Sequence, residues 1–313
     1  MQTMVFKRSM KLMGNHFELS AVAQRQADAD LYIDAGVQEI QRIERLLTTY
    51  DESSETSLIN AQAGLEPVAV SRETFGLIER SIRISQVTQG AFDITYGSID
   101  KRLWNFDSSL RELPDKDTAR RMVRLIDYRN IILDKEKYTV LLKEKGMRIG
   151  FGGIGKGYAA ERAKFIMHQM GADSGVVNAS GDLTTWGYQP DGRAWTIGIV
   201  DPNAAGQVFS SLDVTNMAVA TSGNYEKFVI IDGKRYSHTI NPRTGLPVTG
   251  IKSVTIICPH AEVADAMATP VMIMGIEAGL DMINQMKDIE AILIDDDDHI
   301  YTSDHIHFSK QYT

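Results

Sequence analysis

The sequence predicts an α+β fold with mixed sheets flanked by helices. Stretches with helical spacing and stretches with strand character both occur, but they do not alternate as regular βαβ units. The part of the chain after about residue 175 is rich in short apolar strands separated by turn residues. The chain has 313 residues and 43% hydrophobic residues, which is enough for one large or two ordinary domains with a sizeable core.

The first half is predicted to contain a strand, two amphipathic helices and a strand pair. Apolar residues recur at helical spacing from Leu31 to Leu47, with Ile40 and Ile43 between them. The same spacing returns after Arg72. The expected bounds are 16–22 for the strand, 24–49 and 72–88 for the helices, and 129–133 and 139–142 for the strand pair.

The second half is predicted to begin with a helix over 157–170 and to continue mainly as strands. Asp232-Gly233 is typical of a hairpin turn between two of them. The single cysteine, Cys258, lies in an apolar run and is interpreted as a buried strand residue rather than a nucleophile. The expected strands are 175–179, 195–200, 216–220, 227–231, 235–240, 253–258 and 291–294, with a helix over 261–274.

Charge and composition limit the partners and the location. A net charge of −8 argues against nucleic acid as the main partner. No run approaches the ~18 apolar residues of a membrane helix, and the first ten residues contain no apolar signal core. We therefore expect no membrane association and a cytoplasmic chain as written. A periplasmic or cell-envelope location is expected instead if an N-terminal lipoprotein signal has been removed.

The most informative stretch is the glycine-rich segment from Gly150 to Ala159. It nearly matches the phosphate-binding pattern G-x-x-x-x-G-K-[ST], with Gly150, Gly155 and Lys156 in register. Gly157 stands where the magnesium-binding hydroxyl should be, so a phosphate cradle would need metal ligands from elsewhere. The alternative is a glycine-rich turn that packs a helix tightly onto a sheet.

Two further motifs indicate acid–base and metal chemistry. His238 leaves a strand and enters a Pro/Gly turn, and histidine is the usual general base near neutral pH. Asp265 and Thr269 are four residues apart, so on a helix they share one face and offer hard oxygen ligands to Mg²⁺. A structural histidine and an ordinary helix cap are the alternatives. The acidic run 295–298 is interpreted as a solvated turn.

The order of these motifs resembles the ApbE family of FAD:protein FMN transferases. Single motifs are weak, but eight in the family's order, from Met13 to about Ile294, are specific. They are Met13-Gly14, Ser54-x-x-Ser57-x-x-Asn60, Gly90-Ala-Phe-Asp93-x-Thr95, Gly152-Gly-Ile-Gly-Lys-Gly-Tyr-Ala159, Asn178-x-x-Gly-Asp182, Thr221-Ser-Gly223, His238-x-x-x-Pro-x-x-Gly245 and Asp265-Ala-x-Ala-Thr269.

The resemblance implies a single unit over 1–313 with two lobes and a flavin cleft between them. It also implies Mg²⁺-dependent transfer of FMN from FAD to a threonine or serine of an acceptor protein, with release of AMP. His238 and Lys156 would be catalytic, and Gly155, Asp265 and Thr269 would hold the metal. The implied FAD site is Met13, Tyr50, Ala91, Phe92, Asp93, Gly152, Tyr158 and Thr239.

Two positions depart from the family's pattern, and two other functions stay open. Gly150 stands where relatives often have aspartate, and Ser180 stands where they have a second glycine. One alternative is an FAD pyrophosphatase, or an FAD-binding protein without transferase activity. The other is a P-loop-like nucleotide hydrolase, which the missing hydroxyl at Gly157 disfavours.

Overall fold

An eight-stranded sheet forms the centre of the molecule. The computed structural model describes residues 2–107, 109–200, 208–223 and 228–306. The strand order is β1-β2-β6-β7-β10-β13-β14-β15, and each neighbouring pair is antiparallel. The bounds are β1 Met4–Leu12, β2 Asn15–Ala23, β6 Gly175–Ala179, β7 Asp182–Trp186, β10 Ala218–Gly223, β13 Ile251–Cys258, β14 Glu290–Asp295 and β15 Ile300–Thr302.

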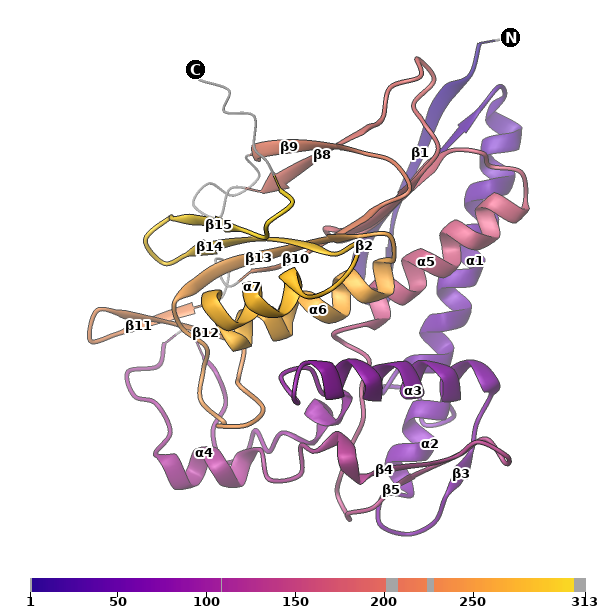
Figure 1. Ribbon diagram of the computed structural model, residues 1–313. Helices are drawn as coiled ribbons and strands as arrows, with labels where there is room; N and C mark the ends of the chain where they lie inside the picture. Colours follow the sequence, from indigo (N-terminus) through magenta and orange to yellow (C-terminus); the bar gives the residue numbers. More distant parts are fainter. Residues whose placement is uncertain (1, 108, 201–207, 224–227, 307–313) are drawn as a thin grey trace.

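Four helices cover one face of this sheet, and a two-stranded ribbon covers the other (Figure 1). The helices contact the strands in the order α1, α5, α6, α7, with α1 against β2 and α7 against β14. On the opposite face, Ile199 of the ribbon packs with Leu183 and Val219 of the sheet. The bounds are α1 Gln26–Leu47, α5 Gly155–Gln169, α6 Ala261–Met274, α7 Ile276–Asn284, β8 Trp195–Val200 and β9 Val208–Val214.

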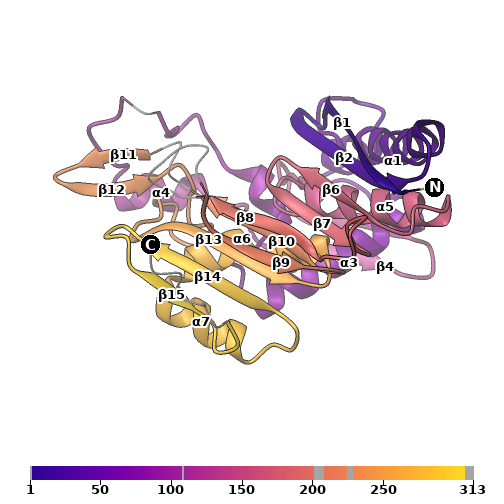
Figure 2. The same cartoon turned by 90° about the horizontal axis from the view of Figure 1, so that it is seen from above.

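The second part of the fold lies below these helices in Figure 1. It consists of α3, which crosses beneath α5 and α6, a small antiparallel sheet of order β3-β5-β4, and the short helix α4. Figure 2 shows the β11–β12 hairpin at the end of the molecule opposite β1 and α1. The bounds are α2 Glu55–Ala61, β3 Val68–Ala69, α3 Arg72–Val87, η1 Ile94–Ser98, α4 Lys116–Met122, η2 Tyr128–Asn130, β4 Ile131–Asp134, β5 Thr139–Leu142, β11 Phe228–Ile231 and β12 Lys234–Ser237.

The α+β class is confirmed, with one correction to the sheets. We expected mixed sheets, but every pairing between described strands is antiparallel. The long helix is confirmed as α1, although Leu31 faces solvent and Ala29 and Ile33 take the inward positions.

Several elements escaped prediction because their signals are short. The strand β1 contains runs of apolar and of polar residues without a regular alternation, and the two-residue turn Met13-Gly14 joins it to β2. The strand expected over 235–240 ends at Ser237, and Ile240 forms only an isolated bridge with Pro247. Of the strand expected over 227–231, residue 227 lies outside the described part. Cys258 is buried in β13 as expected, and burial raises the pKa of its thiol to about 11.

No helix in the described ranges combines the length and the apolar character that crossing a membrane requires.

Candidate active site

The glycine-rich segment forms one wall of a cavity of about 570 Å³. Met13 at the β1–β2 turn and Tyr50 just beyond α1 line the same cavity, together with Gly152 and Lys156. With Gly155, which also lines it, the cavity brings together five of the predicted site residues, although Met13 and Lys156 are 143 positions apart in the sequence. Tyr50 is 97% exposed, so its ring stands at the mouth of the cavity with one of its faces open to a flat ligand.

The path of the chain into this cavity is fixed by an asparagine of α2. The side chain of Asn60 donates to the carbonyl of Ile149 at 3.0 Å and accepts from the amide of Ile149 at 2.7 Å. One residue later, the amide of Gly150 donates to the carbonyl of Ile94. Ser54 caps α2 by accepting from the amide of Ser57. The Ser54–Asn60 motif therefore positions the glycine-rich segment and does not line the cavity.

Gly157 is required by the contact between α5 and α6. A Cβ atom there would lie 2.1 Å from the carbonyl oxygen of Ala261 and 2.7 Å from Cβ of Asp265. The Gly157 amide donates to Oδ2 of Asp265 at 2.9 Å, so an acid on α6 caps the amino terminus of α5. The hydroxyl of a phosphate-binding P-loop has no room at this position.

Replacing Gly157 by alanine should therefore destabilise the fold by about 1–3 kcal/mol, the usual cost of overpacking. Both atoms that the new methyl group would meet first belong to the backbone of Ala261, which cannot move aside as a side chain can. Denaturant unfolding would measure the loss. Gly152→Ala is the matched control, because a Cβ at Gly152 meets nothing within 4 Å. Equal stability of the two variants would contradict this account.

Two buried carboxylates lie around one lysine at this helix start. Lys156 forms an ion pair with Asp182, the first residue of β7, and the charge of Asp265 also acts on Lys156. Burial lowers the pKa of Lys156, but the two carboxylates outweigh it and the pKa is raised. Burial, and then the charge of Asp182, raises the pKa of Asp265 to about 7. Both acids are buried, with Asp182 4% and Asp265 7% exposed.

This charge balance fits a bound divalent cation. Two carboxylates face one ammonium, so the cluster lacks positive charge. Thr269 lies one helical turn beyond Asp265 on α6, and its hydroxyl is 3.2 Å from the hydroxyl of Ser222 at the end of β10. Gly155 begins α5 and lines the cavity. Carboxylate, hydroxyl and carbonyl oxygens are the donor set that Mg²⁺ takes.

The segment Ala91–Asp93 lies behind the glycine-rich segment. A Cβ on Gly153 would be 3.7 Å from the Phe92 ring. Asp93 accepts hydrogen bonds from the amide and hydroxyl of Thr95 at one oxygen and from the amide of Tyr128 at the other. Burial raises the pKa of Asp93. Ala91 and Phe92 are buried, and Asp93 lines a second cavity rather than the one with Tyr50.

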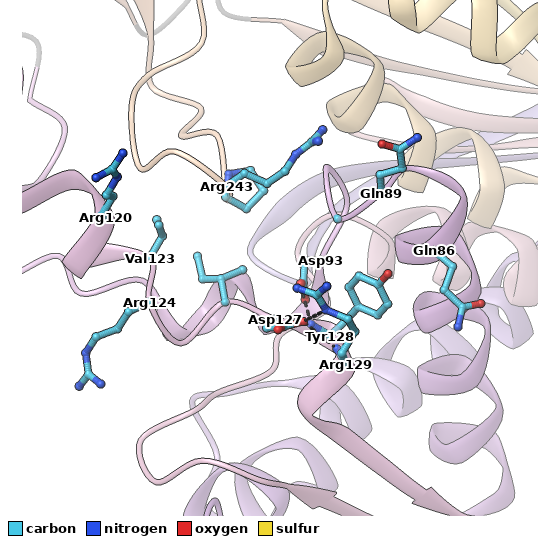
Figure 3. A pocket seen from close by; sticks show the side chains of 13 residues that line it. Gln86, Gln89, Asp93, Arg120, Val123, Arg124, Asp127, Tyr128, Arg129 and Arg243 are labelled. Carbon is cyan, nitrogen blue, oxygen red and sulfur yellow. Dashed lines mark hydrogen bonds and ion pairs between the residues drawn. The ribbon is translucent and has the colours of Figure 1, made fainter. Parts of the chain in front are cut away.

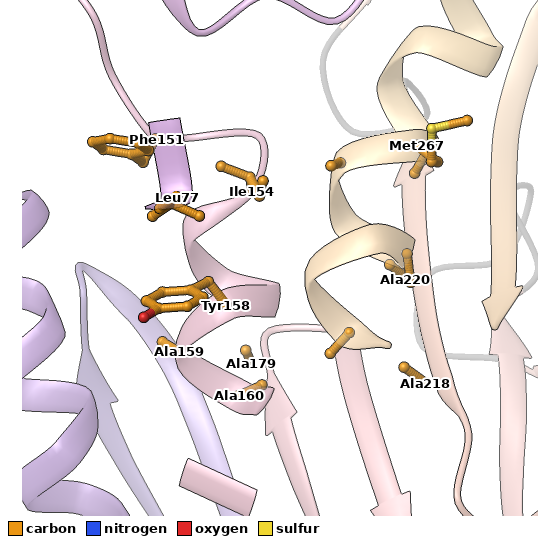
Figure 4. Packing of buried hydrophobic residues seen from close by; sticks show 14 of the residues in the cluster. Leu77, Phe151, Ile154, Tyr158, Ala159, Ala160, Ala179, Ala218, Ala220 and Met267 are labelled. Carbon is orange, nitrogen blue, oxygen red and sulfur yellow. The ribbon is translucent and has the colours of Figure 1, made fainter. Parts of the chain in front are cut away.

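Tyr158 points away from the cavity with Tyr50. Figure 4 shows its ring on the side of α5 that faces Leu77 of α3. Its hydroxyl donates to Oε1 of Glu73 at 2.6 Å, and the guanidinium of Arg80 lies 5.8 Å from its ring centre. Burial and Glu73 raise the pKa of Tyr158. In this arrangement Tyr158 joins α5 to α3, and its assignment to FAD stays a prediction.

His238 lies in a third cavity, of about 320 Å³. Its ring is edge-on to Phe106, with centroids 6.4 Å apart, and Trp104 continues the row of aromatic rings. The next residue, Thr239, accepts from the amide of Val248 and donates its own amide to Ser237. The described contacts do not join His238 to Lys156 or Asp265.

Two tight turns explain further motif residues. Met13 and Gly14 have φ of 49° and 72°, and Ser180 and Gly181 have φ of 58° and 99°. Both pairs form two-residue hairpin turns that need left-handed backbone. Asn178 supports the second turn by accepting from the amide of Gly181. Ser180 therefore occupies a conformation that favours glycine, which accounts for the glycine of the family pattern.

The acidic run leads into the β14–β15 turn, but it is solvated only in part: Asp297 and Asp298 are exposed, whereas Asp295 is the last residue of β14 and is buried. Asp295 accepts from the amides of Asp297 and His299 and from the Tyr301 hydroxyl. Ligand atoms of Asp295, Asp297 and His299 lie within 4.8 Å of one another. These internal hydrogen bonds account for the shape of the turn.

Comparison with known proteins decides the family. The model of the ApbE family matches residues 13–293. The chain belongs to the ApbE family. A relative named FAD:protein FMN transferase from Klebsiella pneumoniae (strain 342) is 33% identical over 292 residues, which are 93% of this chain and 89% of that protein. Another of the same name from Treponema pallidum (strain Nichols) is 32% identical over 279 residues, 84% of this chain and 77% of that protein.

Solved structures of the ApbE family share the fold. The crystal structure of the ApbE protein from Thermotoga maritima superposes with a TM-score of 0.85 at 28% identity, covering 96% of this chain and 97% of that one. The flavin transferase ApbE from Vibrio cholerae superposes with a TM-score of 0.83 at 25% identity, covering 96% and 98%. The resemblance drawn from the motif order is thus confirmed.

The sequence alone did not identify the partner of Lys156. In the sequence Asp182 stands out only as the last residue of the motif Asn178-x-x-Gly-Asp182, and its ion pair with Lys156 depends on the β6–β7 turn. The bond between Ser222 and Thr269 joins two motifs 47 residues apart, Thr221-Ser-Gly223 and Asp265-Ala-x-Ala-Thr269. The fixed order of the motifs was a signal that they meet, but it did not say which atoms do.

Proposed function

We propose that this protein is an enzyme that transfers FMN from FAD to a threonine or serine hydroxyl of an acceptor protein and releases AMP. The observation that carries the proposal is the meeting of Lys156, Asp182 and Asp265 at the start of α5, beside a cavity that Tyr50 and Met13 also line. Membership of the ApbE family and relatives named FAD:protein FMN transferase support it.

Each part of FAD has a proposed place. Tyr50 would stack on the flavin ring at the mouth of the cavity, and Met13 and Gly152 would line its walls. The exposed backbone of the glycine-rich segment would approach the pyrophosphate, and Lys156 would supply positive charge. Asp93, Tyr158 and Thr239 are proposed to complete the site around the remainder of FAD.

Asp265, Thr269 and the carbonyl of Gly155 are proposed to hold Mg²⁺. When bound there, Mg²⁺ would neutralise charge on the pyrophosphate. In the transfer step the acceptor oxygen bonds to the phosphorus of the FMN half, and the bond from that phosphorus to the bridging oxygen breaks. AMP leaves with that oxygen, and the hydroxyl proton passes to His238 as general base.

Hydrolysis of FAD to FMN and AMP is the second candidate, since water can replace the acceptor hydroxyl. The two are separated by incubating the protein with FAD and Mg²⁺, with and without a peptide that carries a flavinylation-type threonine. AMP release and the mass of the peptide are measured together. Transfer predicts a peptide that gains FMN, whereas hydrolysis predicts AMP without any peptide adduct.

Tyr50→Ala should weaken FAD binding about 5- to 150-fold. Loss of a stacked aromatic ring costs on the order of 1–3 kcal/mol, by analogy with stacking on nucleic-acid bases, and 1.4 kcal/mol is about a factor of ten. Flavin fluorescence titration measures the dissociation constant. Tyr50→Phe is the control and should bind nearly as well, because the ring remains. An unchanged constant for Tyr50→Ala would place the flavin elsewhere.

A further inference from the structure

A second cavity, of about 490 Å³, lies between α4, the carboxyl end of α3 and the turn that follows β12 (Figure 3). Four arginines line it from separate parts of the chain. Arg120 comes from α4, Arg124 from the residues just after it, Arg129 from η2, and Arg243 from the turn after β12. Figure 3 shows these side chains on several sides of the cavity.

Three of these guanidinium groups form no direct ion pair within the described residues, although Arg124 adds to the effect of Arg102 in lowering the pKa of Asp100. Arg129 is held by Asp127, with Nε to Oδ1 at 2.8 Å. Arg120, Arg124 and Arg243 form no ion pair and donate no side-chain hydrogen bond to any residue in the described ranges, and all three are exposed. Arginines that line one cavity give it a positive charge, which favours a negatively charged occupant.

The segment that supplies three of these arginines is positively charged, whereas the whole chain is negatively charged. The chain carries a net charge of −8, yet residues 116–129 contain five basic residues and two acidic ones, a local charge of +3. The two carboxylates in the cavity are already engaged, because Asp93 accepts from Thr95 and Tyr128 while Asp127 holds Arg129. They therefore do not neutralise the other arginines.

The turn that carries Arg243 is fixed against α4. Gly245 has φ of 73°, and a Cβ there would lie 2.0 Å from the carbonyl oxygen of Ala119 on α4. Asn241 accepts the amides of Thr244 and Gly245 at its carbonyl and that of Arg243 at its side chain. His238 begins the same segment, so the histidine and the arginine cavity are held on one short, braced stretch of chain.

We propose that Arg120, Arg124 and Arg243 bind an acidic segment of the acceptor protein, rich in aspartate and glutamate, beside the hydroxyl that receives FMN. The proposal rests on the function proposed above. Guanidinium groups match carboxylates in geometry as well as charge. The pyrophosphate of FAD has its own cation, Lys156, in the first cavity, so the arginines of the second cavity are available to another negatively charged partner, beside the part of FAD that is proposed to lie near Asp93. An acceptor seated there would also be steered by long-range attraction.

A direct binding measurement tests the proposed acidic-segment site independently of the transfer reaction. Two fluorescent peptides of equal length would carry one threonine flanked either by aspartate and glutamate or by asparagine and glutamine. Fluorescence anisotropy should show that the wild-type protein binds the acidic peptide about tenfold more tightly, and that added salt weakens this binding. The variant Arg120→Gln/Arg124→Gln/Arg243→Gln should lose the preference. Arg83→Gln/Arg193→Gln/Lys287→Gln removes the same charge elsewhere on the surface and should keep it.

The transfer reaction gives a second readout. With FAD and Mg²⁺, the arginine variant should show KM for the acidic peptide raised about tenfold, with kcat and the affinity for FAD unchanged. Equal binding of both peptides by the wild type, or equal loss in the control variant, would overturn the proposal. So would a loss of FAD affinity in the arginine variant, because the cavity would then serve FAD. Selective binding of the acidic peptide without FMN transfer would keep the arginine site and reject the transferase function.

Discussion

Asp265→Asn should lower Mg²⁺-dependent release of AMP from FAD by about 10³-fold or more. The amide keeps the shape of the side chain but removes the negative charge that would bind the cation. Charge stabilisation by a metal ion contributes several kcal/mol to such a transition state, and each 1.4 kcal/mol is about a factor of ten in rate. The measurement is AMP formation against Mg²⁺ concentration, together with the melting temperature of each variant.

The acidic turn supplies the control for this prediction. Asp297→Asn alters the cluster of Asp295, Asp297 and His299, which also brings ligand atoms together, and should leave AMP release unchanged. If the Asp297 variant lost activity and the Asp265 variant kept it, the functional metal would lie at the β14–β15 turn. Asp265→Ala extends the test, because it also removes the acceptor of the Gly157 amide and should lower stability as well as activity.

From the sequence, the types of chemical group in the site could be predicted better than the contacts between them. The pairing of Asp265 with Thr269 followed from helical spacing alone, and both do lie on α6. For the glycine-rich segment the sequence leaves open a phosphate cradle or tight packing of a helix onto a sheet, and the structure shows that Gly157 is a packing requirement set by Ala261 of another helix, 104 residues later. Periodicity within one segment cannot show such a long-range backbone contact.

Tyr158 and Asp93 show a second limit of prediction from sequence, which concerns the role of a motif residue. Motif matching assigns both to FAD, and in the fold Tyr158 also donates to Glu73 while Asp93 accepts from Thr95 and Tyr128. A residue that belongs to a family motif can support the site from behind as well as touch the ligand. The sequence gives no means of telling these roles apart, because both leave a polar residue at the same position.

His238→Ala should reduce FMN transfer by roughly 10²–10⁴-fold, the usual contribution of a general base, with little change in FAD affinity. The reason is that His238 lies in a cavity with Phe106 and Trp104, apart from the cavity with Tyr50 that is proposed to bind the flavin. The wild type and the variant would each be mixed with FAD, Mg²⁺ and a threonine peptide, and mass spectrometry would show whether the peptide has gained FMN. His168→Ala, an exposed histidine on α5, is the control.

The two readouts of that experiment separate the remaining functions. Loss of transfer with unchanged flavin binding assigns the proton transfer to His238. If the alanine variant transfers FMN at the wild-type rate, the base lies elsewhere, and Asp182 and Ser222 are the next side chains to replace, because both lie in the cluster with Lys156 and Thr269. If the wild type releases AMP but modifies no acceptor, hydrolysis of FAD is the activity. The braced turn from Asn241 to Gly245 makes a misplaced imidazole in the wild type a poor explanation for such a result.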